Sequence, residues 1–465
     1  MIRTDYITAI EISSSKISGT VGVNTYEGIK ILAAASTPVE GFISKGVVRN
    51  VDETSNAINR IINSLEEKLD NVAIKRAYIS LAGLTVHSVR SKVIREFDGY
   101  TKITPDIINE MAEENDATFI TPQGYTRVQA ISQEYKLDGK IDKNPVGAPT
   151  KHIEGNYLNI IIKEQYLEQL NDSFKQAQIE IADSFCAARM DAEIILSPDA
   201  RRNGCALVNI GADTTTIAIY KNEMMRKLVV IPLGSNNITM DLCSLQISKD
   251  EAEEIKITRG YKSSNNEISS VDPDTVNNII GARMNEILHN ARYQIEESNE
   301  NIGHIIFTGG GSKLKNLELL LDEYLPNYKC DIISEPSFSL LSSNGVNLNG
   351  IFSTALYSLL KLGNENCCEE LKPATYTPPV EQKLEFIDNY EPQEEERYEE
   401  IGQPKEAEET KEEIKKTENI NKEKPQKKSK WGKLFNTVKN SVTQGTLEFI
   451  GQITEDDGDD NNNNN

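Results

Sequence analysis

The feature that most constrains the fold is a strand–loop–strand pattern that occurs twice, once in each half of the 465-residue chain. Alternating apolar runs flank a short loop at 10–16 in the first half and a second short loop at 209–216 in the other. Each pair is followed by further strand-like runs and by stretches of helical periodicity at 52–69, 164–178 and 277–297. Strands that alternate with helices predict an α/β protein, and the repetition predicts two related halves.

The expected strands are short and rich in β-branched residues. They read YITAIEI, ISGTVGV, GIKILAAAS, RAYISLAG, CALVNIG, TTIAIY and HIIFTGG. Asp52 is the expected N-cap of the first helix, because an Asp directly before an apolar-periodic run is a typical helix start.

Composition divides the chain into zones. Residues 1–372 have regular apolar periodicity and are expected to fold, whereas 373–427 are rich in Pro, Glu, Lys and Gln. A segment with so few large apolar side chains cannot offset its chain entropy, so we expect a disordered linker. A patterned segment returns at 428–450, and a disordered Asp/Asn tail at 451–465 follows.

Charge and cysteine usage exclude several function classes. The formal net charge of −22 disfavours nucleic-acid binding, since most of the surface would repel phosphate. The six cysteines and four histidines show no metal-ligand spacing, so no metal ligand and no catalytic residue is assigned. The N-terminal residues show no secretory signal, and no apolar run approaches the roughly 20 residues needed to span a bilayer. We therefore expect a cytoplasmic protein.

Three loops are candidates for phosphate contacts, because small and hydroxyl residues in tight turns let backbone N–H groups approach an anion. The candidate residues lie in two strand–loop–strand turns and in a glycine-rich loop after a buried strand: Ser14, Ser15 and Lys16; Gly211, Thr214 and Thr215; Gly310, Gly311 and Ser312. A helix is expected directly after the glycines, so that its N-terminus could face a ligand. Taken singly, each loop could equally be an ordinary turn.

Glu253 and Lys256 are three residues apart in a helical stretch and hence share one face. They could form a surface ion pair, or a polar clamp on a ribose or a base.

Residues 5–362 resemble the actin/Hsp70/sugar-kinase superfamily. The resemblance is carried by the two strand–loop–strand turns, the AEEIK stretch at 252–256 and the FTGGGS loop. Within this superfamily the chain is similar to FtsA, a family of bacterial cell-division proteins, because of a long insertion at 84–178 and the C-terminal helix. The resemblance implies an actin-like two-lobed ATPase fold with an inserted small α+β domain, a disordered linker and a C-terminal amphipathic helix. The implied segments are subdomain 1A at 1–83, 179–202 and 341–372; inserted domain 1C at 84–178; subdomain 2A at 203–235 and 305–340; subdomain 2B at 236–304; and the linker, helix and tail given above.

The resemblance also implies a site for ATP and Mg²⁺. The first two loops would contact phosphates, the third would lie by the adenosine, and Glu253 and Lys256 would contact the nucleoside. Several residues depart from the family pattern: Glu11, Ser13, Asn209 and Ala212-Asp213. Asn209 stands where an Asp usually supports Mg²⁺ through water, and such a loss weakens cation binding. Slow or absent hydrolysis is therefore expected.

The segment 428–450 has an apolar stripe on one helical face, formed by Trp431, Leu434, Phe435, Val438 and Val442. Lys430, Lys433 and Lys439 lie off the stripe. An aromatic face with lysine flanks is typical of a helix that lies on anionic lipid. The alternative is that the stripe docks on the folded body or on another protein.

The leading hypothesis is an adaptor at the cytoplasmic face of the cell membrane and at the division septum. By the family resemblance it would polymerise with itself and bind the C-terminal peptide of FtsZ, with Arg283 as the candidate contact, and later division proteins would remain open as partners. A small-molecule kinase of the same superfamily is an alternative, although no base motif is evident. Another membrane-associated bacterial actin homologue, such as a pilus-assembly or shape protein, is a third.

Overall fold

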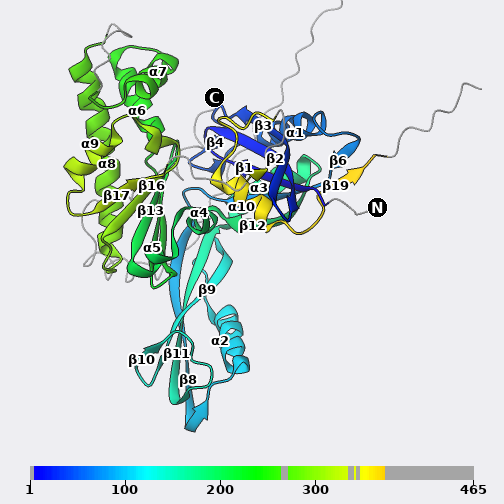
Figure 1. The fold of residues 1–465 in the computed structure, drawn as a ribbon, viewed down its shortest axis with the longest axis vertical. Coiled ribbons are helices and arrows are strands. Elements are labelled where there is room, and N and C mark those ends of the chain that lie inside the picture. The colour runs from blue at the N-terminus through cyan, green and yellow to red at the C-terminus, as the bar shows by residue number, and fades with distance from the viewer. Residues whose placement is uncertain (1–4, 263–270, 334–339, 342–345, 372–465) are drawn as a thin grey trace, which may run out of the picture. The chain divides into compact units, whose positions relative to one another are not determined.

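The computed structural model describes residues 5–262, 271–333, 340–341 and 346–371. The linker, the amphipathic segment and the tail expected from the sequence lie outside these residues. The described part contains two large sheets and a smaller third one (Figure 1). Of the helices within it, none has the length and apolarity needed to cross a bilayer.

The sheet of the first lobe has the order β12-β7-β1-β2-β3-β18. β1 and β2 form a hairpin and β3 pairs antiparallel with β2, while β7 and β12 add to the other side in parallel. The strand bounds are β1 Ile7–Ile12, β2 Lys16–Thr25, β3 Gly28–Pro38, β7 Arg76–Leu81, β12 Glu180–Cys186 and β18 Leu340–Leu341.

The sheet of the second lobe, β15-β14-β13-β16-β17, repeats this arrangement. β13 and β14 form the hairpin, β15 pairs antiparallel with β14, and β16 and β17 add in parallel. The bounds are β13 Cys205–Ile210, β14 Thr215–Lys221, β15 Met224–Ile231, β16 His304–Thr308 and β17 Lys329–Ile332. Two copies of one topology confirm the two related halves, and the fold is the actin-like ATPase fold.

Helices cover the two sheets and bury separate apolar cores. Those of the first lobe are α1 Val51–Glu66, α3 Glu164–Gln176, α4 Ala187–Ile195 and α10 Thr354–Leu362. Those of the second lobe are α6 Ser235–Leu242, α7 Lys249–Arg259, α8 Pro273–Glu297 and α9 Leu317–Tyr324, and the short α5 Pro198–Asn203 joins the lobes. Small two-stranded sheets complete the first lobe: β4 Ile43–Ser44 with β5 Val47–Val48, and β6 Val72–Ile74 with β19 Cys368–Glu370.

Helix boundaries differ from the sequence expectation where capping decides them. The expected N-cap Asp52 is wrong: the cap is Asn50, whose extended backbone lets its side chain accept from Glu53 N at 3.1 Å. Asp52 instead lies in the first turn, where a negative charge suits the helix dipole. α8 begins at Pro273, before the expected residue 277, because Asp272 caps it and Pro is favoured at the first helical position.

The insertion forms a separate sheet of order β10-β9-β11-β8 with one helix on it. Its elements are β8 His87–Lys102, α2 Pro105–Thr118, β9 Tyr125–Leu137, β10 Lys140–Asp142 and β11 Pro149–Lys163. Met111 from α2 packs on Tyr135 and Tyr157 in a small core. Helix α3, at the end of the insertion, packs Phe174 into the core of the first lobe.

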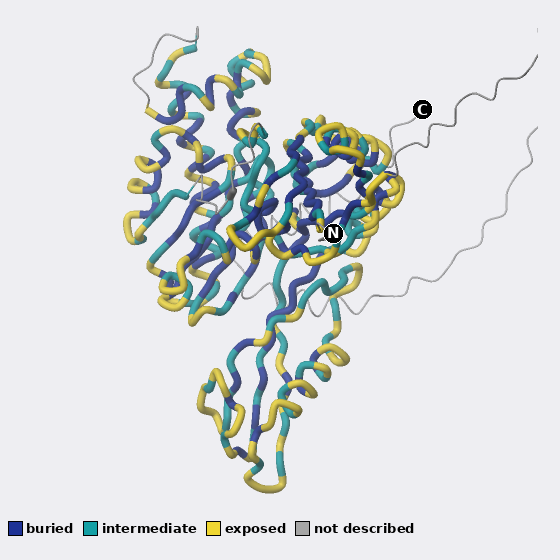
Figure 2. Tube along the Cα trace, turned by 45° about the vertical axis from the view of Figure 1, so that its right-hand side comes forward, coloured by how far each residue is buried: buried dark blue, intermediate teal, exposed yellow. Residues whose placement is uncertain are grey.

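The burial pattern shows how the inserted sheet is attached (Figure 2). Ile160 and Ile162 of β11 share a core with Leu207 and Leu228 of the second lobe. Next to this core the buried Arg226 guanidinium pairs with the Glu134 carboxylate. The base of the inserted domain therefore packs on the second lobe, although its chain leaves from the first.

Two glycines let the β4–β5 turn approach the end of β7. A Cβ on Gly83 would lie 2.6 Å from Gly46 O, and Gly83 has a φ of +108°. An L side chain meets both a steric clash and an unfavourable backbone region at this position.

We expect Gly83→Ala to destabilise the protein by about 2–3 kcal/mol, because it combines backbone strain with a displaced turn. The measurement is the thermal unfolding midpoint of the purified chain. Gly99→Ala is the matched control, since its Cβ meets open space. Equal midpoints for the two variants would contradict the close approach.

Candidate functional site: three loops and the turn between them

The first loop closes the β1–β2 hairpin through its own hydroxyls. Ser13 N donates to Lys16 O at 3.1 Å, and Ser13 Oγ donates to the same oxygen at 2.8 Å. Ser13, which stands where the family usually has Gly, therefore helps to close the turn. Ser15 is exposed, and the Lys16 ammonium donates to Gly350 O.

The second loop closes the β13–β14 hairpin in a comparable way. Gly211 N donates to Thr214 O at 2.8 Å. The candidate Thr215 is fully buried and its hydroxyl donates to Leu233 O at 2.8 Å, so it holds β14 to the segment before α6. Thr214 is only half-buried.

The turn between β4 and β5 brings the first two loops together. Gly46 N donates to Ser14 Oγ at 2.7 Å. The preceding amide, Lys45 N, donates to Asp213 Oδ2 at 3.0 Å. Two consecutive backbone amides thus contact the two candidate phosphate loops, one loop in each lobe. Sequence reasoning missed this turn, and its only local signal is Gly46.

The third loop presses against the end of β13. Gly309 has a φ of +91°, and a Cβ on it would lie 2.3 Å from Asn209 Oδ1. A Cβ on Gly311 would lie 2.4 Å from Ile210 Cγ2, whereas the Cβ position of Gly310 is open. Ser312 is buried and donates to Gly309 O at 2.8 Å. Glycines are needed at 309 and 311 because the loop backbone packs directly on the side chains of Asn209 and Ile210.

The predicted start of the helix after the glycines is wrong. Gly310–Lys313 forms a 3₁₀ turn, and α9 begins only at Leu317, after Asn316 in a left-handed conformation. The amides near the glycines therefore belong to a short turn and not to the N-terminus of an α-helix.

Glu253 and Lys256 join α7 to α6. Lys256 is buried, and its ammonium donates to Glu253 Oε2 at 2.7 Å, Thr239 Oγ1 at 2.9 Å and Ser235 O at 3.3 Å. The ion pair thus joins a buried ammonium to a carboxylate whose side chain is 41% exposed. Because Ser235 N in turn donates to Gly211 O at 2.9 Å, the network also fixes the start of α6 beside the second loop.

Two carboxyl groups that the sequence did not single out as a pair lie near the hairpin loops: Glu11 on β1, and Asp191 on α4, which bonds to Asn209 at the end of β13. Burial, opposed by the Ser353 hydroxyl and Lys16, raises the pKa of Glu11. Burial and the nearby Glu11 raise the pKa of Asp191 to about 7, although Asn209 Nδ2 donates to Asp191 Oδ2 at 3.1 Å. Glu11 stands three residues before Ser14 and Asn209 stands two residues before Gly211, so the carboxyl pair belongs to the same neighbourhood.

Arg283 lies on α8, away from the loops. Its guanidinium donates to both oxygens of Asp241 in α6, with Nε to Oδ2 at 2.6 Å and NH2 to Oδ1 at 3.0 Å, and also pairs with Glu286. The Arg283 side chain is 23% exposed, and its guanidinium is engaged in these ion pairs. Its partner role stays a prediction.

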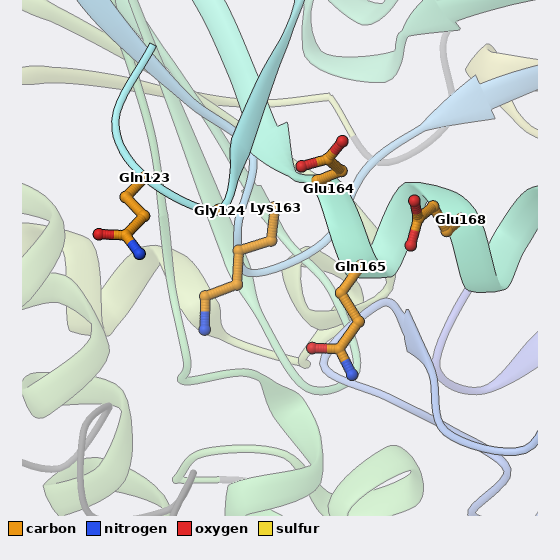
Figure 3. Close-up of a pocket in the computed structure, with 6 residues that line it drawn as sticks. All are labelled: Gln123, Gly124, Lys163, Glu164, Gln165 and Glu168. Carbon is orange, nitrogen blue, oxygen red and sulfur yellow. The ribbon is translucent and has the colours of Figure 1, made fainter. Parts of the chain in front are cut away.

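A separate polar pocket lies where the inserted sheet meets α3 (Figure 3). Six residues line it: Gln123, Gly124, Lys163, Glu164, Gln165 and Glu168. Glu164 N donates to Gly124 O at 2.9 Å, which joins two of the lining segments. The pocket contains none of the loop residues and does not extend the phosphate site.

Within the described residues, no cluster of three or more His, Cys, Asp or Glu side chains could hold a metal ion. A nucleotide-bound Mg²⁺ usually needs only one or two carboxylates in addition to phosphate and water. Glu11 and Asp191 supply two carboxyl groups beside the phosphate loops, so the residues present fit such an ion.

Comparison with known proteins finds similar sequences in one family. The family model described as "Cell division protein FtsA" matches residues 206–343, which span the second lobe. The FtsA of Porphyromonas gingivalis is 28% identical over 348 residues, covering 68% of this chain and 71% of that protein. The FtsA of Bacillus subtilis is 25% identical over 349 residues, covering 70% and 78%.

A solved structure supports the fold independently. The PilM–PilN type IV pilus biogenesis complex superposes with a TM-score of 0.55 at 15% identity, covering 76% of this chain and 98% of that one. Likeness at this identity shows the fold alone. With the family match and the relatives, it confirms the resemblance: the chain has an actin-like fold and is similar in sequence to the FtsA family of bacterial cell-division proteins.

Proposed function

We propose that this protein binds ATP with Mg²⁺ at the three loops, polymerises with itself, and tethers the FtsZ ring to the cytoplasmic membrane at the division septum. The observation that carries the nucleotide site is the pair of contacts made by the Lys45–Gly46 turn. Through them Ser14 of one hairpin and Asp213 of the other lie within hydrogen-bond reach of adjacent amides. Two small-residue loops that face one another across two lobes suit a chain of phosphates.

The candidate residues have different parts in this proposal. Lys16 would supply the cationic contact, exchanging its bond to a neutral carbonyl for one to a phosphate. The amides of the third loop would pack against the adenosine, where Gly310 leaves space. Thr215, Glu253 and Lys256 are held in internal bonds, so their contribution would be to keep the second loop and α6 in place.

A bound Mg²⁺ would supply positive charge between the phosphates and the carboxyl pair. Glu11 and Asp191 would orient toward it with their hard oxygen atoms, while Asn209 contributes no charge. An amide in place of a carboxylate weakens the hold on the cation and its water. We therefore expect slow or absent hydrolysis, with ATP serving assembly.

The membrane and partner parts rest on the sequence and on the family. The stripe at 431–442 and its lysines lie outside the described residues. Each lysine near anionic lipid contributes on the order of 1 kcal/mol. The linker at 373–427 has a root-mean-square reach of roughly 40 Å, which lets the body move while the helix stays bound. FtsA is a cell-division family, so the proposal adds the FtsZ C-terminal peptide as a ligand of the α6–α8 region, near Arg283.

The nucleotide site predicts that Lys16→Ala weakens MgATP binding about tenfold or more, because a charge-assisted phosphate contact is lost. Isothermal titration calorimetry on the full chain measures the affinity. Lys30→Ala is the matched control, since Lys30 is an exposed lysine on β3 of the same lobe. Absence of ATP binding by the wild-type chain would refute the site.

The same preparation tests hydrolysis. Turnover by the wild-type chain is expected to stay below about one ATP per second. Faster turnover that depends on an added small-molecule acceptor would favour the kinase alternative instead.

The raised pKa of Asp191 predicts a pH dependence of stability without nucleotide. The folded protein keeps a proton up to about pH 7 that the unfolded chain releases near its ordinary pKa of 3.8. Stability is therefore highest in acid and falls as the pH rises from about 4 to about 7. At pH 8, Asp191→Asn should be more stable than wild type by on the order of 3 kcal/mol, and the two should converge near pH 4.

Thermal unfolding between pH 4 and pH 8 measures this difference. Asp183→Asn is the control, because Asp183 is exposed on β12. A gap between wild type and Asp191→Asn that does not change with pH would contradict the buried-carboxyl account.

The membrane helix predicts that the full chain co-sediments with phosphatidylserine-containing vesicles and that a chain ending at Pro425 does not. Phe435→Glu should weaken vesicle binding about tenfold or more, since a buried phenyl ring stabilises by roughly 1.5–3 kcal/mol. Asn436→Glu adds the same charge off the stripe and should bind nearly as wild type. Equal sedimentation of the full and shortened chains would refute the tether.

The FtsZ part can be read from the same vesicles. Purified FtsZ should pellet with vesicles that carry the full chain, and FtsZ that lacks its C-terminal peptide should not. Recruitment that is independent of this peptide would contradict the proposed contact.

A further inference from the structure

The second phosphate loop is bonded to the first lobe by its two atypical polar residues. Asn209, at the end of β13, donates from Nδ2 to Asp191 Oδ2 at 3.1 Å. Asp213, in the loop itself, accepts from Lys45 N through Oδ2 at 3.0 Å. Asp191 lies on α4, which follows directly from β12 of the first sheet, and Lys45 lies in the β4–β5 turn of the first lobe. Both bonds therefore cross from one lobe to the other.

The Asp213 carboxylate is held from both sides. Its Oδ1 accepts from Asn236 Nδ2 at 2.7 Å, and Asn236 N donates to Ala212 O at 2.7 Å. The carboxylate is thus held in place by its own lobe while it accepts from Lys45 N. A carboxylate that accepts from a backbone amide makes a charge-assisted hydrogen bond, which is stronger than one between neutral groups.

The amide side chain of Asn209 complements the carboxyl group of Asp191. An Asp at 209 would put a second carboxylate about 3 Å from Asp191, and two such groups cannot both ionise. Asn209 instead offers an N–H to the Asp191 carboxyl group. The Asn209 side-chain amide, which weakens a cation site, therefore makes an interlobe hydrogen bond here.

We propose that Asn209 and Asp213 form an interlobe latch that holds the two phosphate loops together without a bound nucleotide. In this arrangement the protein supplies, through its own side chains, the bridging contacts that phosphates would otherwise make. ATP then enters a site that is already closed, and its binding adds little further closure. The consequence for ATP rests on the proposed nucleotide site, whereas the latch itself does not.

The test compares two neighbouring amides. Lys45 N bonds to the second lobe, and Gly46 N bonds to Ser14 Oγ within the first lobe. Hydrogen–deuterium exchange with electron-transfer fragmentation measures both in the nucleotide-free full chain. Asp213→Ala should speed exchange at Lys45 about tenfold or more and leave Gly46 within about twofold, because only the interlobe acceptor is lost.

Asp322→Ala is the matched control. Asp322 is an exposed aspartate on α9 of the same lobe, and its removal should change neither amide. Unchanged exchange at Lys45 in Asp213→Ala would overturn the latch. Equal acceleration at Lys45 and Gly46 would also overturn it, because that pattern means that the whole turn opens within the first lobe.

A reciprocal exchange tests the second bond. At pH 8, Asn209→Asp alone should speed exchange at Lys45, since it removes the N–H donor and sets a second carboxyl group against Asp191. Combining it with Asp191→Asn restores one carboxyl and one amide and should return exchange to within about threefold of wild type. Failure of the pair to restore exchange would contradict the assignment of Asn209 to the latch.

Adding MgATP separates this inference from the proposed function. In wild type, saturating MgATP should slow exchange at Lys45 less than about twofold, whereas in Asp213→Ala it should restore most of the lost protection. If calorimetry shows that the chain binds no ATP, the proposed function fails while the nucleotide-free result still decides the latch. A large ATP-dependent gain of protection in wild type would contradict closure by the latch.

Discussion

Two consecutive backbone amides hold the candidate site together. Lys45 N donates to Asp213 in the second lobe and Gly46 N donates to Ser14 in the first, so one short turn spans the two hairpins. The turn can do this because Gly46 and Gly83 approach at a distance that no side chain allows. The third loop lies next to the second hairpin, since Gly309 and Gly311 pack closely against the end of β13. Each loop alone resembles a common turn, and their convergence is what supports the proposed nucleotide site.

The departures from the family pattern gain a physical meaning from this geometry. Ser13 closes its own hairpin, and Asn209 and Asp213 bond across to the first lobe. Near these bonds a carboxyl pair remains whose pKa values are raised by burial. Buried carboxyl groups reduce stability at neutral pH, which is a common cost at functional sites. The proposed latch would suit the proposed role, in which ATP supports assembly more than turnover.

The fold was largely predictable from the sequence, and the site only in part. Strand periodicity located the hairpins and the repeated topology, because β-branched runs and short hydroxyl-rich turns are local signals. The helix starts at Val51, Pro273 and Leu317 depended on the caps Asn50 and Asp272 and on the left-handed Asn316, which periodicity does not reveal. Asp191 and Lys45 could not be found, since their roles come from contacts between residues 18 and 168 positions apart in the chain. Only the folded backbone brings such residues together.

The most direct measurement is a crystal structure of the folded body with Mg²⁺ and a non-hydrolysable ATP analogue. The account predicts that the phosphates lie between the hairpin loops, within hydrogen-bond distance of Lys16 and of amides in both loops. It also predicts that the adenosine lies beside Gly310 and Gly311. A nucleotide bound elsewhere, such as in the polar pocket beside α3, would contradict the central claim, as would loops that stay empty at saturating analogue.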